Sequence, residues 1–158
     1  MYTLLISSFS TYNKILIMSL TARLHIKGHK HEEKGIKVLS CGYSFYQKVN
    51  EDGYIAGSVR AGLINISISA INDTEIVQWM VLRNDQKSGK ISFSGIDPET
   101  AAPQEIKTLE FYNAILVNYS ESFNDEADMV MNLSISAPKI KLSNSEWETT
   151  GWDIEPQK

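Results

Sequence analysis

The sequence predicts a mainly β protein: a small β-barrel, or two packed antiparallel sheets, with one flanking α-helix. Apolar and polar residues alternate along most of the chain, which is typical of half-buried strands. One segment breaks this period of two and shows helical spacing instead. The chain has 158 residues, of which 42% are hydrophobic and 22% charged. A single soluble domain with its own core is therefore expected.

Two strands are predicted in the first third of the chain. Apolar Ala22, Leu24 and Ile26 alternate with polar residues in 21–27, and residues 36–47 are rich in β-branched and aromatic side chains. The polar, glycine-flanked segment between them predicts a turn. Residues 50–62 contain several Gly, Asn and Asp residues, which predict a long loop.

The later strands include two that carry small uncharged residues on their polar face. Residues 63–70 and 129–137 alternate isoleucine, leucine or methionine with serine and asparagine. An ordinary solvent-facing strand would carry more Lys and Glu. The small polar residues are Asn65, Ser67, Ser69, Asn132, Ser134 and Ser136. Further strands are predicted at 90–94, at 105–114 and 115–123 (or one long bent strand), and at 139–142.

One helix is predicted between the strands at 63–70 and 90–94. Asn72 with Glu75 three residues later forms a variant of the capping box. Ile76, Trp79 and Met80 then recur at helical spacing and are expected to face the core. The pattern predicts a helix of about ten to twelve residues that ends near residue 84.

Composition excludes several classes of function. The formal net charge is −4 and the isoelectric point is about 5.4, whereas proteins that bind nucleic-acid phosphates are usually basic. No apolar run reaches the roughly 20 residues of a membrane-spanning helix. Cys41 is the one cysteine, so no internal disulfide forms. The sequence predicts no nucleic-acid partner and no stable membrane insertion.

No constellation of catalytic residues emerges. The glycine motifs of phosphate-binding and dinucleotide-binding loops are missing, as is the G-x-S-x-G nucleophile elbow. Cys41 lies in an apolar strand, which favours an inert buried thiol. Zinc-ligand residue types cluster at His25, His29, His31, Glu32 and Glu33, but a solvated hairpin turn explains them without a metal. We predict no enzyme activity, no metal and no cofactor.

The two ends of the chain lie outside the predicted strands. Residues 1–17 lack the basic start and small-residue cleavage site of a secretory signal, and Met18 offers a second start. We expect an extension, or a misassigned start, ahead of a single domain over 18–158; a targeting peptide is the alternative. Trp147 and Trp152 are expected to pack on the domain or on a neighbour.

Several segments, in order and spacing, resemble the type VI secretion tube proteins called TssD or Hcp (haemolysin-coregulated protein), in the form found in Bacteroidetes. The resemblance covers Met18 to about Trp152, and its most specific element is Asp-Thr-Glu-x-x-x-Trp-Met. The matching segments are CGYSFYQ at 41–47, GLINISIS at 62–69, DTEIVQWM at 73–80, SGKISF at 88–93, KTLEF at 107–111, VNYSESF at 117–123, LSISA at 133–137 and EWE at 146–148.

The resemblance implies a structural protein that forms hexameric rings stacked into a tube. A contractile sheath, a spike protein and effector proteins would be its partners. It would assemble in the bacterial cytoplasm and then be secreted. The loop at 50–62 would reach the next ring through Tyr54, Ile55 and Arg60, although Ala61-Gly62 stands where the family has a glycine pair. The small polar faces would line the lumen.

Two alternatives to a secretion tube remain at this point. One is the tube protein of a related phage-tail-like contractile particle, which sequence separates poorly from the first interpretation. The other is a monomeric barrel that binds a small ligand in its interior, which requires an internal cavity with a few convergent polar groups.

Overall fold

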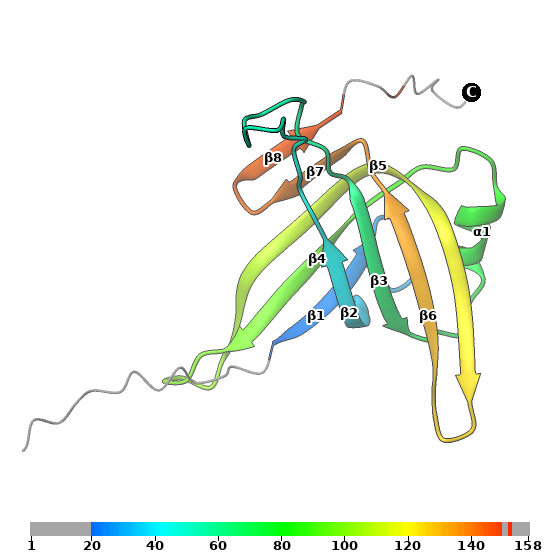
Figure 1. The fold of residues 1–158 in the computed structure, drawn as a ribbon. Helices are drawn as coiled ribbons and strands as arrows, with labels where there is room; N and C mark the ends of the chain where they lie inside the picture. The colour runs from blue at the N-terminus through cyan, green and yellow to red at the C-terminus, as the bar shows by residue number, and fades with distance from the viewer. Residues whose placement is uncertain (1–19, 150–151, 153–158) are drawn as a thin grey trace, which may run out of the picture.

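Figure 1 shows the fold in a computed structural model, which describes residues 20–149 and Trp152. The prediction that residues 1–17 form an extension lies outside the described residues and stays a prediction. The described elements are β1 (Thr21–Ile26), β2 (Ile36–Tyr43), β3 (Leu63–Ser69), α1 (Glu75–Val81), β4 (Lys87–Ile96), β5 (Pro103–Asn124), β6 (Ala127–Ser136), β7 (Lys139–Leu142) and β8 (Ser145–Glu148).

The sheet closes into a barrel. The strand order is β4-β1-β2-β3-β6-β5, and β5 pairs back with β4, so six strands form the ring. The pairings are antiparallel. β7 and β8 continue the sheet from the first half of β5, outside the closed ring. The prediction of a mainly β barrel with one flanking helix is confirmed.

The barrel interior is built by the alternation seen in the sequence. β3 pairs with β6 in a register that sets Ile66 opposite Leu133 and Ile68 opposite Met131. These side chains and their neighbours on the same face are buried, because successive side chains of a strand point to opposite sides. The small polar residues therefore lie on the other face.

Some strand boundaries differ from those predicted. β5 is one strand of 22 residues, so the option of one long strand is the correct one. β2 ends at Tyr43, four residues before the predicted end. β8 was not predicted. Its four residues include two glutamates and show no alternation long enough to detect.

Helix α1 packs on the flank of the barrel and is shorter than predicted. Ile76 and Trp79 are buried, as expected. The indole of Trp79 stacks on Phe111 of β5 and donates a hydrogen bond to the carbonyl of Ala114 at 3.2 Å. Met80 is 40% exposed, so its placement in the core was wrong. The indole fills the contact with the barrel and leaves the next residue at the rim.

The start of α1 also differs from the predicted cap. Thr74 holds the N-cap position without a side-chain hydrogen bond, and the helix begins at Glu75. The carboxylate of Asp73 accepts a hydrogen bond from the Glu75 amide at 3.1 Å. Asn72 therefore lies two residues too early to cap the helix, and the adjacent aspartate satisfies the helix amide instead.

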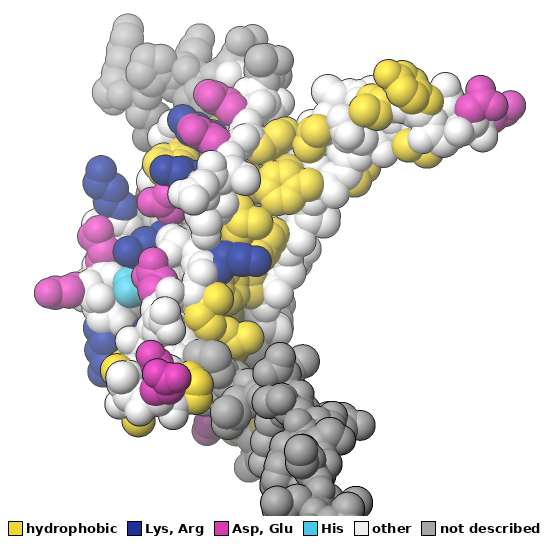
Figure 2. All heavy atoms as spheres, turned by 90° about the vertical axis from the view of Figure 1, so that its left-hand side faces the viewer, with side chains coloured by type: hydrophobic (Ala, Val, Ile, Leu, Met, Phe, Trp, Pro, Cys, Tyr) yellow, Lys and Arg dark blue, Asp and Glu magenta, His cyan; other side chains and the backbone are white. Residues whose placement is uncertain are grey.

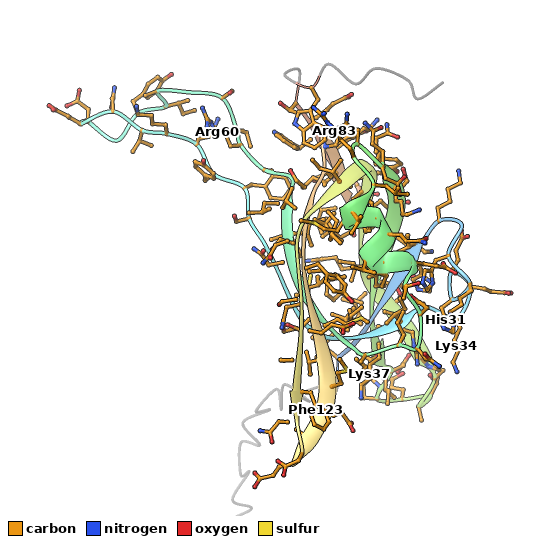
Figure 3. All side chains as sticks on the ribbon, turned by 90° about the vertical axis from the view of Figure 1, so that its right-hand side faces the viewer. His31, Lys34, Lys37, Arg60, Arg83 and Phe123 are labelled. Carbon is orange, nitrogen blue, oxygen red and sulfur yellow. The ribbon has the colours of Figure 1, made fainter. Side chains whose placement is uncertain are left out.

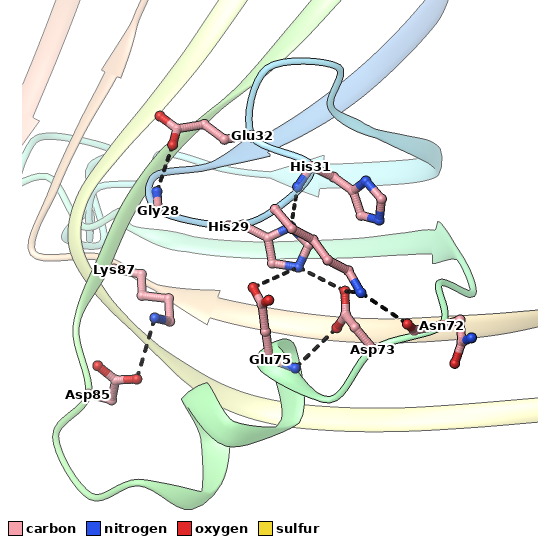
Figure 4. Close-up of polar contacts among 10 residues, drawn as sticks. Gly28, His29, His31, Glu32, Asn72, Asp73, Glu75, Asp85 and Lys87 are labelled. Carbon is pink, nitrogen blue, oxygen red and sulfur yellow. Dashed lines mark hydrogen bonds and ion pairs between the residues drawn. The ribbon is translucent and has the colours of Figure 1, made fainter.

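The turn between β1 and β2 is fastened to the start of α1 (Figure 4). His29 is buried, and its Nδ1 accepts a hydrogen bond from the His31 amide at 3.0 Å. Its Nε2 therefore carries the proton, 3.0 Å from Oδ2 of Asp73. The Nζ of Lys30 donates to the Asn72 carbonyl at 3.0 Å. The interpretation as a solvated turn was wrong for His29, which joins two elements.

Within residues 20–149 and Trp152, no group of three or more His, Cys, Asp or Glu side chains is placed to hold a metal ion. In the same part of the chain, no helix has the length and apolar character needed to cross a membrane.

Candidate functional site

The predicted loop is an ordered arm, formed by residues 44–61 between β2 and β3. Figure 3 shows it projecting from the barrel, with Arg60 on its returning side. Tyr46 and Arg60 exchange two backbone hydrogen bonds of 2.9 and 2.8 Å, and Val49 bridges to Ile55. The arm is therefore a narrow two-stranded ribbon, longer than the predicted loop at 50–62.

The tip of the arm is ordered by Asn50. Its side-chain Oδ1 accepts hydrogen bonds from the amides of Asp52 at 3.1 Å and Tyr54 at 2.9 Å. Gly53 has a φ of 79°, a left-handed conformation that glycine adopts without strain. Local hydrogen bonds of this kind are those by which asparagine shapes turns. The arm thus holds its own shape at the tip.

The arm exposes apolar side chains. Tyr54 is 73% exposed and Ile55 is 54% exposed, and Tyr46 and Val49 are also exposed. In Figure 2 the arm extends from the body with apolar side chains along it and acidic side chains at its end. A protruding apolar surface of this kind marks an interaction site. The structure brings the predicted Tyr54, Ile55 and Arg60 together on this one feature.

The six small polar residues share one face of the β3–β6 pair. Ser67 donates to Oδ1 of Asn132 at 2.6 Å. One step along the ladder, Ser134 donates to Oδ1 of Asn65 at 2.7 Å. Ser69 and Ser136 lie on the same face, two residues further along their strands. The face is therefore uncharged over these positions, and four of the six side chains bond to one another in two pairs.

In the part of the chain that the structure describes, β2 and β5 each have a stretch of edge without a backbone partner, as does β8 at the end of the sheet. β2 pairs with β1 only through residues 36–38; after a bulge at Leu39, residues 40–43 pair with β3 alone. The last third of β5 pairs with β6 alone. Leu39 and Val117, on these segments, are exposed. Unpaired strand edges are ready-made sites for pairing with another chain.

A family model described as "Hemolysin coregulated protein Hcp (TssD)" matches residues 18–152. This chain belongs to the Hcp (TssD) family. It is thus a tube subunit of the type VI secretion system and not an enzyme, as predicted. Neither the small-ligand barrel nor the other contractile particle is favoured by the match. A search of curated proteins found no match.

Solved Hcp structures share the fold. Hcp1 from Flavobacterium johnsoniae is 26% identical, with a TM-score of 0.68, over 82% of this chain and 99% of that chain. Hcp1 from the E. coli EAEC 042 pathovar is 13% identical, with a TM-score of 0.64, over 84% and 98%. The secreted protein Hcp3 from Pseudomonas aeruginosa is 10% identical, with a TM-score of 0.58, over 84% and 100%.

The titratable groups fit a structural member of the Hcp family. Burial raises the pKa of the Cys41 thiol to about 11, which keeps it protonated and unreactive at neutral pH. Cys41 is half-buried rather than fully buried. Burial and a hydrogen bond to Glu121 raise the pKa of Tyr119 to about 12. Both shifts hold the groups in their neutral form, and a nucleophile would need the opposite.

Proposed function

We propose that the chain forms six-membered rings that stack into a secretion tube, with the arm as the contact between successive rings. The single observation that carries this proposal is the arm: an ordered ribbon whose Tyr54 and Ile55 stay exposed in the protomer. A protein does not gain stability from apolar side chains left in water. Their burial against a neighbouring ring accounts for them.

The unpaired edges support closure of a ring. A subunit in a cyclic hexamer contacts its two neighbours through two different surfaces. Residues 39–43 of β2 and the last third of β5 offer two separate edges with free backbone donors and acceptors. Pairing between such edges would satisfy these groups and cover Leu39 and Val117.

The polar face of β3 and β6 is proposed to line the lumen. Side chains that bond to each other, as Ser67 does to Asn132, offer few free groups to a passing protein. The absence of charge at these six positions avoids attraction to cargo of either sign. Effector proteins would then travel inside the ring. A contractile sheath and a spike protein would be the remaining partners, with assembly in the bacterial cytoplasm before secretion.

Replacement of Tyr54 and Ile55 by serine tests the stacking role. We expect the double variant to form rings of wild-type mass by light scattering, because the arm contributes none of the buried core. Tube assembly seen by electron microscopy, and secretion, should both fall. The matched control is Val81→Ser with Leu82→Ser, which removes two exposed apolar residues at the end of α1.

Three results decide the matter. Reduced tubes in the arm variant, with normal tubes in the α1 variant, would support the proposal. Unchanged tubes in the arm variant would contradict it. Monomers in the arm variant would place Tyr54 and Ile55 in the lateral contacts of the ring, and the stacking role would be wrong.

A further inference from the structure

We propose that Trp147 of β8 is a positioning residue that fixes the direction of the arm. The C-terminal hairpin β7–β8 would thereby set the geometry in which one ring meets the next. This inference rests on the proposed stacking role for its consequence, and on the contacts of Trp147 for its physical basis. Figure 1 places β8 beside the base of the arm.

Trp147 makes a direct hydrogen bond to the arm. Its indole Nε1 donates to the carbonyl of Val59 at 3.0 Å, which links residues 88 positions apart in the sequence. Val59 directly precedes Arg60, whose backbone pairs with Tyr46 on the outgoing side. The bond therefore anchors the returning side of the arm. The backbone hydrogen bonds between Arg60 and Tyr46 then hold the outgoing side in place as well.

The indole is carried by a fixed part of the molecule. In the β7–β8 hairpin, Trp147 lies opposite Ile140, which is buried in the core. β7 in turn pairs with β5 of the barrel. The Thr149 amide donates to the Pro138 carbonyl at 2.8 Å and closes the end of the hairpin. The donor that holds the arm is thus attached to the barrel rather than to another loop.

The root of the arm passes directly beneath the indole at Gly62. Its φ is 97°, and a Cβ built on it would lie 2.9 Å from Cζ3 of Trp147 and 2.2 Å from the Ala137 carbonyl oxygen. The Gly62 carbonyl accepts a hydrogen bond from the Ala137 amide at 2.8 Å. The chain is therefore held between the indole and the β6–β7 corner at the point where the arm joins β3.

Space for movement lies next to this contact. A cleft of about 320 Å³ opens beside the arm base. It is lined by residues of the arm, the β6–β7 corner and the C-terminal segment, including Ser58, Val59, Ala137, Trp147 and Trp152. Without the Nε1–Val59 bond, the returning side of the arm has room to swing. The hydrogen bond from Trp147 thus holds the returning side of the arm in one direction relative to the barrel.

The test is Trp147→Phe, which keeps an aromatic ring but removes the N–H donor. Its matched control is Trp79→Phe, which removes indole hydrogen bonds to Asp85 and Ala114 at the helix, away from the arm. Isolated rings are digested briefly with trypsin, and cleavage after Lys48 and Arg60 is followed by mass spectrometry alongside cleavage after Lys107 in β5. Thermal melting and tube assembly are measured on the same samples.

We expect Trp147→Phe to speed cleavage after Lys48 and Arg60 by about 2- to 13-fold, the factor that corresponds to one lost hydrogen bond. Cleavage after Lys107 and the mass of the rings should stay as in wild type, and tube assembly should fall. Trp79→Phe should lower the melting temperature and leave the arm's cleavage relative to Lys107 unchanged.

Two results would overturn the inference. One is wild-type cleavage of the arm in Trp147→Phe. The other is faster cleavage at all three sites alike, which would mean that Trp147 stabilises the whole fold rather than the arm. The proposed function fails separately: if the serine variant at Tyr54 and Ile55 assembles tubes while Trp147→Phe loosens the arm, Trp147 positions the arm but the arm does not stack rings.

Discussion

The β3–β6 pair and the arm use the same backbone pairing but bury their side chains differently. Ile64 of β3 is 0% exposed, whereas Ile55 of the arm is 54% exposed. β3 lies in a closed barrel, so one face of the strand is sealed from water. The arm is a two-stranded ribbon with no second layer, and such a ribbon buries little on either face. An isoleucine in a paired strand is therefore buried only when the sheet closes on itself or another layer covers it.

This difference predicts that stability lies in the barrel and assembly in the arm. The core holds buried residues from β1 to β7 and from α1, while the arm contributes none of them. A substitution in the barrel should change the free energy of unfolding of the protomer. A substitution in the arm should instead change the contacts between protomers.

The largest effect is expected for Trp79→Ala. Trp79 is buried between α1 and β5 and stacks on Phe111. Its loss should lower the free energy of unfolding by about 3–5 kcal/mol, the range for removal of a large core aromatic. Urea unfolding of the rings at fixed protein concentration measures this. A midpoint equal to that of wild type would show that the contact between α1 and the barrel does not stabilise the protomer. The view that stability lies in the barrel core would then be wrong at this site.

A pair of glycines compares the root of the arm with its tip. Gly62→Ala should destabilise the protein by about 1–3 kcal/mol or more, because a positive φ is strained for alanine and the new Cβ meets the Ala137 carbonyl at 2.2 Å. Gly53→Ala has a similar φ of 79°, but no atom lies within 4 Å of its Cβ.

In thermal melts of the two variants, Gly53→Ala should therefore lower the melting temperature less than Gly62→Ala does. Equal losses would mean that backbone strain alone matters, and that the tight contact at Gly62 relaxes at no cost. A larger loss at Gly53 would contradict the view that the arm tip is separate from the cooperative core.

A smaller loss of stability is expected on the polar face. Asn132→Ala removes the acceptor of the Ser67 hydroxyl. The free energy of unfolding should fall by about 0.5–1.5 kcal/mol, the usual net value of one hydrogen bond.

Asn50→Ala in the arm removes the acceptor of two backbone amides. Its melting temperature should nevertheless match wild type, and a loss as large as that of Asn132→Ala would place the arm within the cooperative unit.

Prediction from the sequence was accurate where one local pattern decides the structure. The alternation at 63–70 and 129–137 identified both strands and the faces of residues 64–69 and 131–136. It was less accurate where partners distant in sequence decide. Met80 has helical spacing, but its exposure depends on how the Trp79 indole fills the flank of the barrel. In the sequence His29 looks like an ordinary turn residue. The fold places its Nε2 3.0 Å from Oδ2 of Asp73, which is 44 residues further along the chain.

The candidate surfaces divide in the same way. The sequence named Tyr54, Ile55 and Arg60 and the six small polar residues as candidates, because unusual composition at a loop or strand face can be seen in the sequence alone. Their roles in stacking and in the lumen stay predictions. It could not show that residues 44–61 form a ribbon, since the Tyr46–Arg60 pairing has weak local signals. It predicted that Trp147 packs on the domain or on a neighbour, but it could not name the partner, because the Val59 carbonyl lies 88 residues away.

Local patterns in the sequence were enough to establish the β class, the helix after β3, the two faces of β3 and β6, and the family. Side-chain period and segment order are local properties, and a strand of period two can bury only one of its faces. Contacts between segments distant in sequence set which strand edges remain unpaired, where the arm projects and what anchors it. These follow from barrel closure, which brings β5 back to β4 and sets the C-terminal hairpin against the root of the arm.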